Sequence, residues 1–162
     1  MLRRTLSVTA SGLVLMGLLV GLSSGIQAQT TDCTLTQGFW KTHPDAWPTE
    51  TIMIGRVTYT KEEALRVLST PPKGGDATYI LAHQLIAAKL NMLNGADGTT
   101  VVFTINAADA WLSTHPLGTG GPTSADRETG ILLAGQLDAF NSGLSGPPHC
   151  DAEPTATPPP VV

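Results

Sequence analysis

The chain has few charged residues, few aromatic residues and few cysteines. Of its 162 residues, 14% are charged, 5% are aromatic and two are cysteine. Nine scattered Lys and Arg residues form no basic patch of the kind that nucleic acids or anionic membrane surfaces attract, so both partners are excluded. The cysteines form no CxxC pair, and no HExxH, GxSxG or glycine-rich phosphate loop is present. The sequence therefore carries none of these signatures of catalysis or metal binding.

Residues 1–28 have the layout of a secretory signal peptide. Arg3 and Arg4 precede the apolar run 12–22, and the residues up to Ala28 are small and weakly polar. We expect cleavage after Ala28, with a retained N-terminal anchor as the alternative. No second long apolar run follows, so no membrane span is expected after signal removal. Seven basic residues would then stand against 13 acidic ones, a net charge of −6 that is ordinary for a secreted protein.

The two cysteines, Cys33 and Cys150, bracket nearly all of the part that is expected to fold. In an oxidising compartment such a pair indicates one disulfide, with free or intermolecular thiols as the alternative. Closing so long a loop stabilises a fold by about 4–5 kcal/mol in the chain-entropy model. We expect residues 29–150 to form a compact secreted domain. The Pro- and Thr-rich residues 151–162 are expected to form an extended tail or linker.

Hydrophobic periodicity predicts a mainly α-helical single domain of about four helices with a short β-hairpin. The predicted hairpin pairs residues 52–54 with residues 57–59 through a type II′ turn. The predicted helices span residues 60–70, 76–94, 106–115 and 124–142. The second has the widest apolar stripe and is expected at the centre of the domain. Residues 101–103 are expected to be a brief extended run.

Residues 36–48 read TQGFWKTHPDAWP and contain two of the three tryptophans. The two prolines prevent a regular helix throughout this segment. Together with residues 54–60 (IGRVTYT) and 81–91 (LAHQLIAAKLN), it resembles a family of uncharacterised secreted bacterial domains. Members share a TQG[YF]WKxHPxxWP opening and a LAHQLIAAKLN helix. The resemblance covers most of residues 33–95, and it implies secretion and a shared small fold but no reaction.

A Thr-His-Pro tripeptide follows a tryptophan twice, after Trp40 and after Trp111. The second instance has one additional residue between the tryptophan and the tripeptide, and the flanking sequences differ. We therefore interpret the echo as a coincidence and not as an internal repeat.

The aromatic opening supplies the candidate ligand-binding residues. They are Trp40, Lys41, His43, Asp45 and Trp47. Exposed indoles flanked by polar side chains would suit a glycan or a peptide. The alternative is that the tryptophans fill the core of a small domain, which we favour for Trp40 and Trp111. For Trp47 the sequence leaves both roles open.

Three histidines, His43, His83 and His115, are weak candidates for a zinc site with an open position for water. None has a second ligand three or four residues away, as a helical metal motif requires. His83 lies on the flank of an apolar stripe, so we expect a core histidine bonded to a backbone group or to Gln37. We predict no metal and no cofactor.

The paired acidic residues are expected to be helix caps, not catalytic groups. Glu62 and Glu63, and likewise Asp126 and Glu128, fall in the first turns of predicted helices, where carboxylates favour the positive end of the macrodipole. The loop at residues 94–98 lacks the oxygen spacing of a calcium site. No catalytic residue is predicted.

These observations predict a secreted, non-catalytic domain that serves as an extracellular or cell-surface binding or structural module. Its partner would be an unknown extracellular ligand or surface component. A glycan- or peptide-binding module that uses exposed tryptophans is one alternative, and a metal-dependent hydrolase with a histidine-built site is another. The ligand and the oligomeric state stay open.

Overall fold

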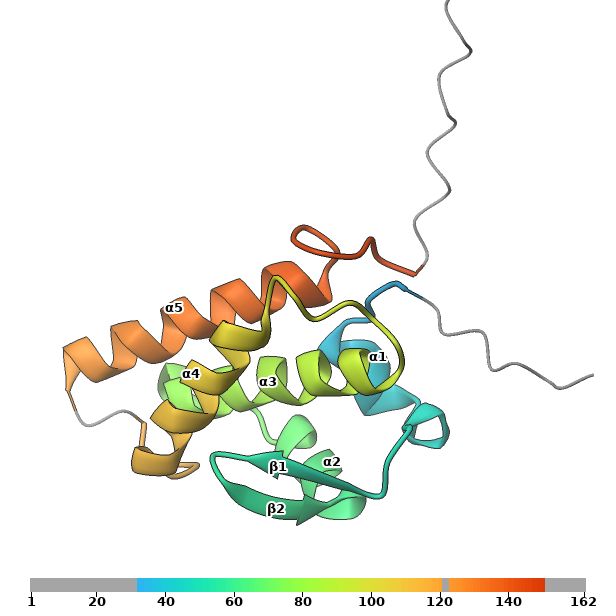
Figure 1. Cartoon of the computed structure of the whole chain (residues 1–162). Helices are drawn as coiled ribbons and strands as arrows, with labels where there is room; N and C mark the ends of the chain where they lie inside the picture. The colour runs from blue at the N-terminus through green and yellow to red at the C-terminus, as the bar shows by residue number, and fades with distance from the viewer. Residues whose placement is uncertain (1–31, 121–122, 151–162) are drawn as a thin grey trace, which may run out of the picture.

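Helix α3 (Ala77–Leu93) runs through the centre of the domain (Figure 1). The computed structural model describes residues 32–120 and 123–150. Twelve of the 17 residues of α3 are buried, because the helix carries apolar side chains on most of its circumference. Its first turn is capped by Asp76, whose side chain accepts a hydrogen bond from the Thr78 N–H. The prediction of a central helix is confirmed.

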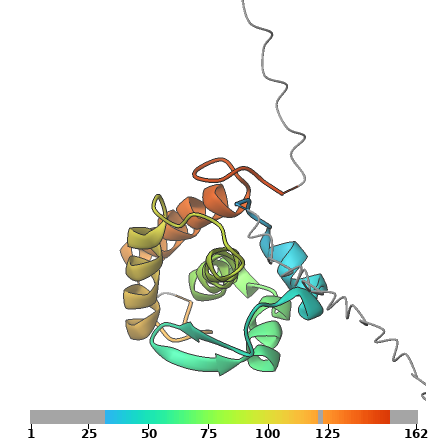
Figure 2. The ribbon, with the colours of Figure 1, turned by 45° about the vertical axis from the view of Figure 1, so that its right-hand side comes forward.

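The other elements surround α3. They are helices α1 (Gln37–Thr42), α2 (Lys61–Ser69), α4 (Val102–Thr114) and α5 (Ser124–Asn141), the 3-10 turns η1 (Pro44–Ala46) and η2 (Lys73–Gly75), and strands β1 (Thr51–Ile54) and β2 (Val57–Thr60). Helix α3 contacts each of the other four α-helices and β1. Figure 2 views α3 nearly end-on, with these elements arranged around it. The predicted mainly α-helical domain with one hairpin is confirmed.

The hairpin has the predicted strands but a different turn. Ile52 pairs with Tyr59 and Ile54 pairs with Val57, and both isoleucines are buried. Gly55 has φ +58° and Arg56 has φ +67°, so the turn has the two positive φ angles of type I′ and not the single one of type II′. A Cβ atom on Gly55 would lie 2.9 Å from Leu112 Cβ, so close packing against α4 also demands glycine here.

Helix α4 begins at Val102, so the predicted extended run at residues 101–103 is wrong. The β-branched residues of this segment are typical of strands. In the fold, however, Val101 and Ile105 are both buried, and their spacing of four residues places them on one helix face. The predicted helix start at Asn106 is wrong for the same reason. Asp109 therefore lies in the middle of α4 and does not cap it.

The two Thr-His-Pro tripeptides end two helices in the same way. His43 is the C-cap of α1 and His115 is the C-cap of α4, with φ near −122° and −126° respectively. Each histidine places Nδ1 within 3.0 Å of the carbonyl oxygen four residues earlier, and each ring stacks on the aromatic ring at that position. Those aromatic residues are Phe39 and Trp111. FWKTHP and WLSTHP therefore align without a gap. The interpretation of the echo as a coincidence missed that both segments form the same C-terminal helix cap.

The two ends of the described domain are joined. Cys33 and Cys150 form a disulfide with a Cα–Cα distance of 4.9 Å across a sequence separation of 117 residues. The Thr34 N–H donates to the Pro148 carbonyl, and the Cys150 N–H donates to the Thr34 carbonyl. The predicted disulfide is confirmed. The predicted signal peptide and the predicted tail lie outside the described residues.

Helix α5 ends as predicted, with Gly143 at φ +70° and its N–H bonded to the Phe140 carbonyl. A Cβ atom on Gly130 would lie 2.9 Å from the Trp111 ring, so this glycine allows α5 to approach α4 closely. Leu144 follows the end of the helix and is 81% exposed.

Candidate functional site

A cleft of about 300 Å³ lies between α1, the C-terminal end of α2 and α3. It is lined by Gln37, Gly38, Lys41, Leu68, Ser69, Thr70, Pro71, Pro72 and His83. The prolines end α2 because they lack a backbone donor and disfavour continued helix. The chain changes direction after α2, and the hydroxyl-bearing residues Ser69 and Thr70 line the cleft.

His83 forms the inner wall of this cleft from α3. Its side chain is buried, and Nε2 lies 2.8 Å from the Val67 carbonyl oxygen. A carbonyl oxygen can only accept, so Nε2 carries the proton of the neutral ring and Nδ1 is its acceptor nitrogen. The prediction of a core histidine bonded to a backbone group is confirmed. The hydrogen bond is to Val67, not to Gln37.

Burial lowers the pKa of His83 below its ordinary value of 6.5. The carbonyl of Val67 acts in the opposite direction, and the positive charge of Lys41 lowers the pKa further. The histidine is therefore held in its neutral form near neutral pH. A negative charge placed in the cleft would offset both lowering effects.

Lys41 is the one charged residue among the residues that line the cleft, and its side chain is exposed on α1. No carboxylate lines the cleft, although acidic residues outnumber basic ones in the whole chain. Amide and hydroxyl groups from Gln37, Ser69 and Thr70 supply hydrogen-bonding capacity around the lysine. The Thr70 hydroxyl donates to the Arg66 carbonyl at 2.8 Å. Electrostatically, the cleft suits an anionic group.

The five predicted ligand-binding residues are divided by the fold. Trp40 is fully buried and Trp47 is 6% exposed. The Trp40 Nε1–H donates to Asn91 Oδ1, and the Trp47 Nε1–H donates to the Trp40 carbonyl at 2.8 Å. An aromatic platform of exposed tryptophans is therefore not formed. The large apolar area of each indole is buried in the core, and its polar edge is satisfied there.

Lys41, His43 and Asp45 are exposed. Lys41 lines the cleft, whereas His43 stacks on Phe39 with ring centroids 4.2 Å apart. His43 therefore serves as a helix cap at the surface. Asp45 lies in η1, and it is not among the residues that line the cleft.

Trp111, the third tryptophan, is buried as predicted, with 8% of its surface exposed. Its ring stacks on His115 with centroids 4.1 Å apart. His115 Nε2 lies 3.6 Å from Asp126 Oδ1 at the start of α5. The second capping histidine thus lies between α4 and α5, away from the cleft.

The three histidines do not gather into a metal site. Within residues 32–120 and 123–150, no group of three or more His, Cys, Asp or Glu side chains is placed to hold a metal ion. His43 and His115 are occupied at the ends of α1 and α4, and His83 is bonded to Val67. The histidine-built hydrolase site therefore has no geometric support in these residues.

One member of each acidic pair caps a helix as predicted, Glu63 at α2 and Asp126 at α5, whereas Glu62 forms an ion pair with Arg66. Glu63 Oε2 accepts from the backbone N–H and from the hydroxyl of Thr60, and these hydrogen bonds lower the pKa of Glu63. The Thr123 hydroxyl donates to Asp126 at the start of α5. Asp97 Oδ1 accepts from the Thr99 N–H and closes a turn. These contacts give Glu63, Asp126 and Asp97 structural roles.

Sequence reasoning missed the part of the cleft that α2 contributes. Ser69 and Thr70 lie at the end of the predicted helix 60–70, directly before two prolines, and neither was among the predicted binding residues. The available signal was the pair of hydroxyl residues before a double proline, which leaves polar groups at an open helix terminus. No pattern in the sequence indicated that this terminus would face Lys41.

No family model, curated protein or solved structure matches the chain. The resemblance to secreted bacterial domains therefore stays a prediction from the motifs. Among the described helices, none combines the length and the apolar character that crossing a bilayer requires.

Proposed function

We propose that the protein is a secreted, non-catalytic binding module that holds an anionic group of an extracellular ligand in the cleft between α1, α2 and α3. The observation that carries this proposal is the composition of the cleft, which has one lysine, one neutral histidine and no carboxylate. A ligand carboxylate would form a charge-assisted hydrogen bond with Lys41. The disulfide supports secretion, because such bonds persist in oxidising compartments.

The cleft offers a ligand both polar and apolar contacts. Lys41, Gln37 and Ser69 supply polar groups, and Leu68, Pro71 and Pro72 supply an apolar wall. This combination is typical of sites for small ligands, where a few polar groups orient a largely apolar contact. Acidic sugars and the C-terminal carboxylate of a peptide both carry the required anion. They belong to the glycan and peptide classes that the sequence predicts.

Titration with acidic probes tests the proposal. Glucuronate, galacturonate and a short N-acetylated peptide with a free C-terminus are added to ¹⁵N-labelled protein, and amide shifts are followed by NMR. Glucose and the C-terminal amide of the same peptide are the uncharged controls. We expect shifts at Lys41, Ser69 and His83 with the acidic probes only. We also expect the pKa of His83 to rise on binding, because a nearby negative charge favours the imidazolium.

Two lysine variants separate the cleft from general charge attraction. Lys41→Gln is expected to abolish the shifts and the rise in the His83 pKa. Lys61→Gln removes the same charge from the start of α2, where Lys61 lies 3.7 Å from Glu50, and should leave both effects in place. Equal loss in the two variants, or shifts centred away from His83, would contradict the proposal.

A further inference from the structure

A second face of the domain, unrelated to the cleft, exposes large apolar side chains. Met53 is 49% exposed, Leu93 is 57% exposed and Phe103 is 83% exposed.

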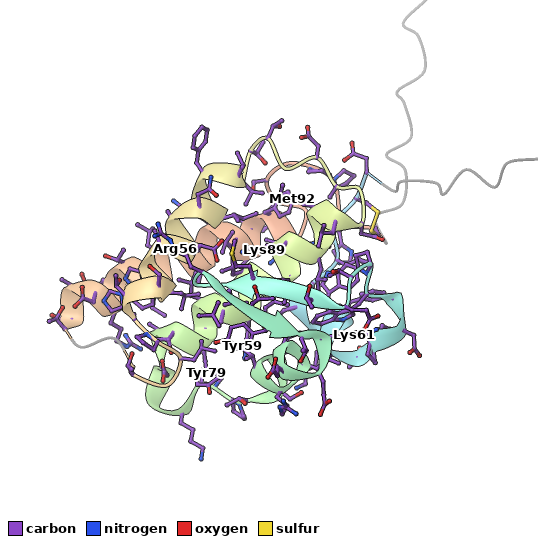
Figure 3. All side chains as sticks on the ribbon, turned by 60° about the horizontal axis from the view of Figure 1, so that its bottom comes forward. Arg56, Tyr59, Lys61, Tyr79, Lys89 and Met92 are labelled. Atoms are coloured by element: carbon purple, nitrogen blue, oxygen red, sulfur yellow. A yellow bond between two sulfur atoms is a disulfide. The ribbon has the colours of Figure 1, made fainter. Side chains whose placement is uncertain are left out.

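A groove of about 450 Å³ lies between β1, the end of α3 and the start of α4. Its apolar lining comes from Met53, Met92, Leu93, Val102 and Ile105. Lys89 and Met92 lie on the same side of the hairpin in Figure 3. Grouped apolar exposure of this kind marks an interaction surface.

Helix α4 contributes an uncharged solvent face beside the groove. Asp109 is its one charged residue, and that side chain is buried against Lys89. The exposed positions Phe103, Asn106, Ala107 and Ala110 fall on one side of the helix. Surface helices usually carry charges on their solvent side. The small side chains here permit close approach by another helix.

The edge of β1 is partly occupied by side chains. The Thr49 hydroxyl donates to the Thr51 carbonyl at 2.8 Å and accepts from the Thr51 N–H at 3.3 Å. Lys89 Nζ donates to the Met53 carbonyl at 2.6 Å. These contacts disfavour pairing with an incoming strand. We therefore expect the occupant of this face to pack through side chains.

The charges at the two ends of the face have opposite sign. Asp97 is exposed in the loop that leads into α4, where the Val101 N–H bonds the Gly98 carbonyl. Arg56 is exposed at the hairpin turn, beside Gly55, whose N–H bonds Asp109 in the second half of α4. An anion therefore lies near the start of α4 and a cation lies near its later turns.

We propose that this face binds a second copy of the chain about a twofold axis. The symmetry would place the two α4 helices antiparallel, with Asp97 of one copy opposite Arg56 of the other. Such a face is complementary to itself, as an isologous interface requires, since each end finds the opposite charge. In this arrangement the Phe103 side chain of one copy packs against the later turns of α4 in the second copy, and the small residues Ala107 and Ala110 lie near the axis.

Sedimentation equilibrium over a concentration series tests this dimer with the purified full chain after secretion. The wild type is expected to show a monomer–dimer equilibrium. Phe103→Asp should weaken the dimer by roughly 30-fold or more, as expected for a central aromatic residue. Arg56→Asp should weaken it through repulsion by Asp97, and Arg56→Asp with Asp97→Arg should restore it. Thermal melts confirm that each variant is folded.

Leu132→Asp is the matched control, because Leu132 is 64% exposed on α5 and lies outside this face. It should leave the dimer dissociation constant unchanged. A wild type that stays monomeric up to about 1 mM, the weak end of measurable affinities, overturns the proposal. The proposal is also overturned if Phe103→Asp leaves the dimer dissociation constant unchanged, or if Leu132→Asp raises it. The ligand titration at the cleft is read separately in the Phe103→Asp variant, so the two proposals fail independently.

Discussion

Lys89 on α3 and Asp109 on α4 form an ion pair with 2.6 Å between Nζ and Oδ2. Both side chains are largely shielded from solvent, at 14% and 12% exposure. The pair also holds the hairpin, because Lys89 donates to the Met53 carbonyl and Asp109 accepts from the Gly55 N–H. This ion pair therefore links α3, α4 and the hairpin.

Lys89→Met is expected to lower the free energy of unfolding by about 3 kcal/mol, because it leaves the Asp109 carboxylate shielded without its cation. The double variant Lys89→Met with Asp109→Asn should lose less than the sum of the two single losses. Arg66→Met is the control, since its partner Glu62 is 83% exposed, and such a pair contributes about 0.5 kcal/mol or less. Urea denaturation measures the wild type, the two single variants, the double variant and the control, and additive losses would show that the two residues act separately.

Removal of the disulfide is expected to lower the free energy of unfolding by about 4 kcal/mol, because the loop that it closes spans 117 residues. The variant Cys33→Ser with Cys150→Ser, and wild type treated with a reductant, should lose similar amounts. Guanidinium denaturation followed by circular dichroism provides the measurement. A reduced protein as stable as the oxidised one would show that the contacts of Thr34 suffice to hold the ends.

Acidification is expected to destabilise the protein through His83. Its pKa in the folded protein lies below 6.5, so the unfolded chain takes up this proton at a higher pH than the native protein does. The stabilisation is fully present above pH 6.5 and is lost as the pH falls from 6.5 through the folded pKa. The slope is at most about 1.4 kcal/mol per pH unit. His83→Gln should flatten the dependence between pH 7.5 and pH 5.

Asn91 holds four hydrogen bonds in the core with 1% of its surface exposed. Its amide bonds both backbone groups of Leu35, the Trp40 indole and the Asn141 side chain. Asn91→Leu keeps the volume but leaves these groups unpaired, so we expect a loss of at least about 3 kcal/mol in the free energy of unfolding. Asn106→Leu on the exposed side of α4 is the control. A small loss in Asn91→Leu would show that water replaces the amide.

The sequence was sufficient for elements with strong local signals. The predicted helix start at residue 60 is confirmed, and Thr60 and Glu63 form a capping box there with both hydrogen bonds present. The predicted span 76–94 agrees with α3 to within one residue at each end, and Asp76 caps its first turn. These signals are reliable because they depend on hydrogen bonds among neighbouring residues. The start of α4 was missed because burial of Val101 and Ile105 overrides the strand preference of the segment.

The candidate site was less predictable than the fold. Lys41, one of the predicted ligand-binding residues, lines the cleft, but the prediction grouped it with tryptophans that the fold buries. The buried Trp47 indole donates a hydrogen bond to the Trp40 carbonyl, seven residues away. No periodic sequence pattern predicts such a contact. The Lys89–Asp109 pair was missed for the same reason, since 20 residues separate its members.

The position of the disulfide determines how the domain carries mechanical load. Tension applied to segments before Cys33 and after Cys150 passes through the bond between these residues, since their Cα atoms are 4.9 Å apart. The helices between them lie outside the line of force. In the oxidised form the domain therefore acts as a short, inextensible link. In the reduced form the same tension would act on the backbone hydrogen bonds that join Thr34 to Pro148 and Cys150.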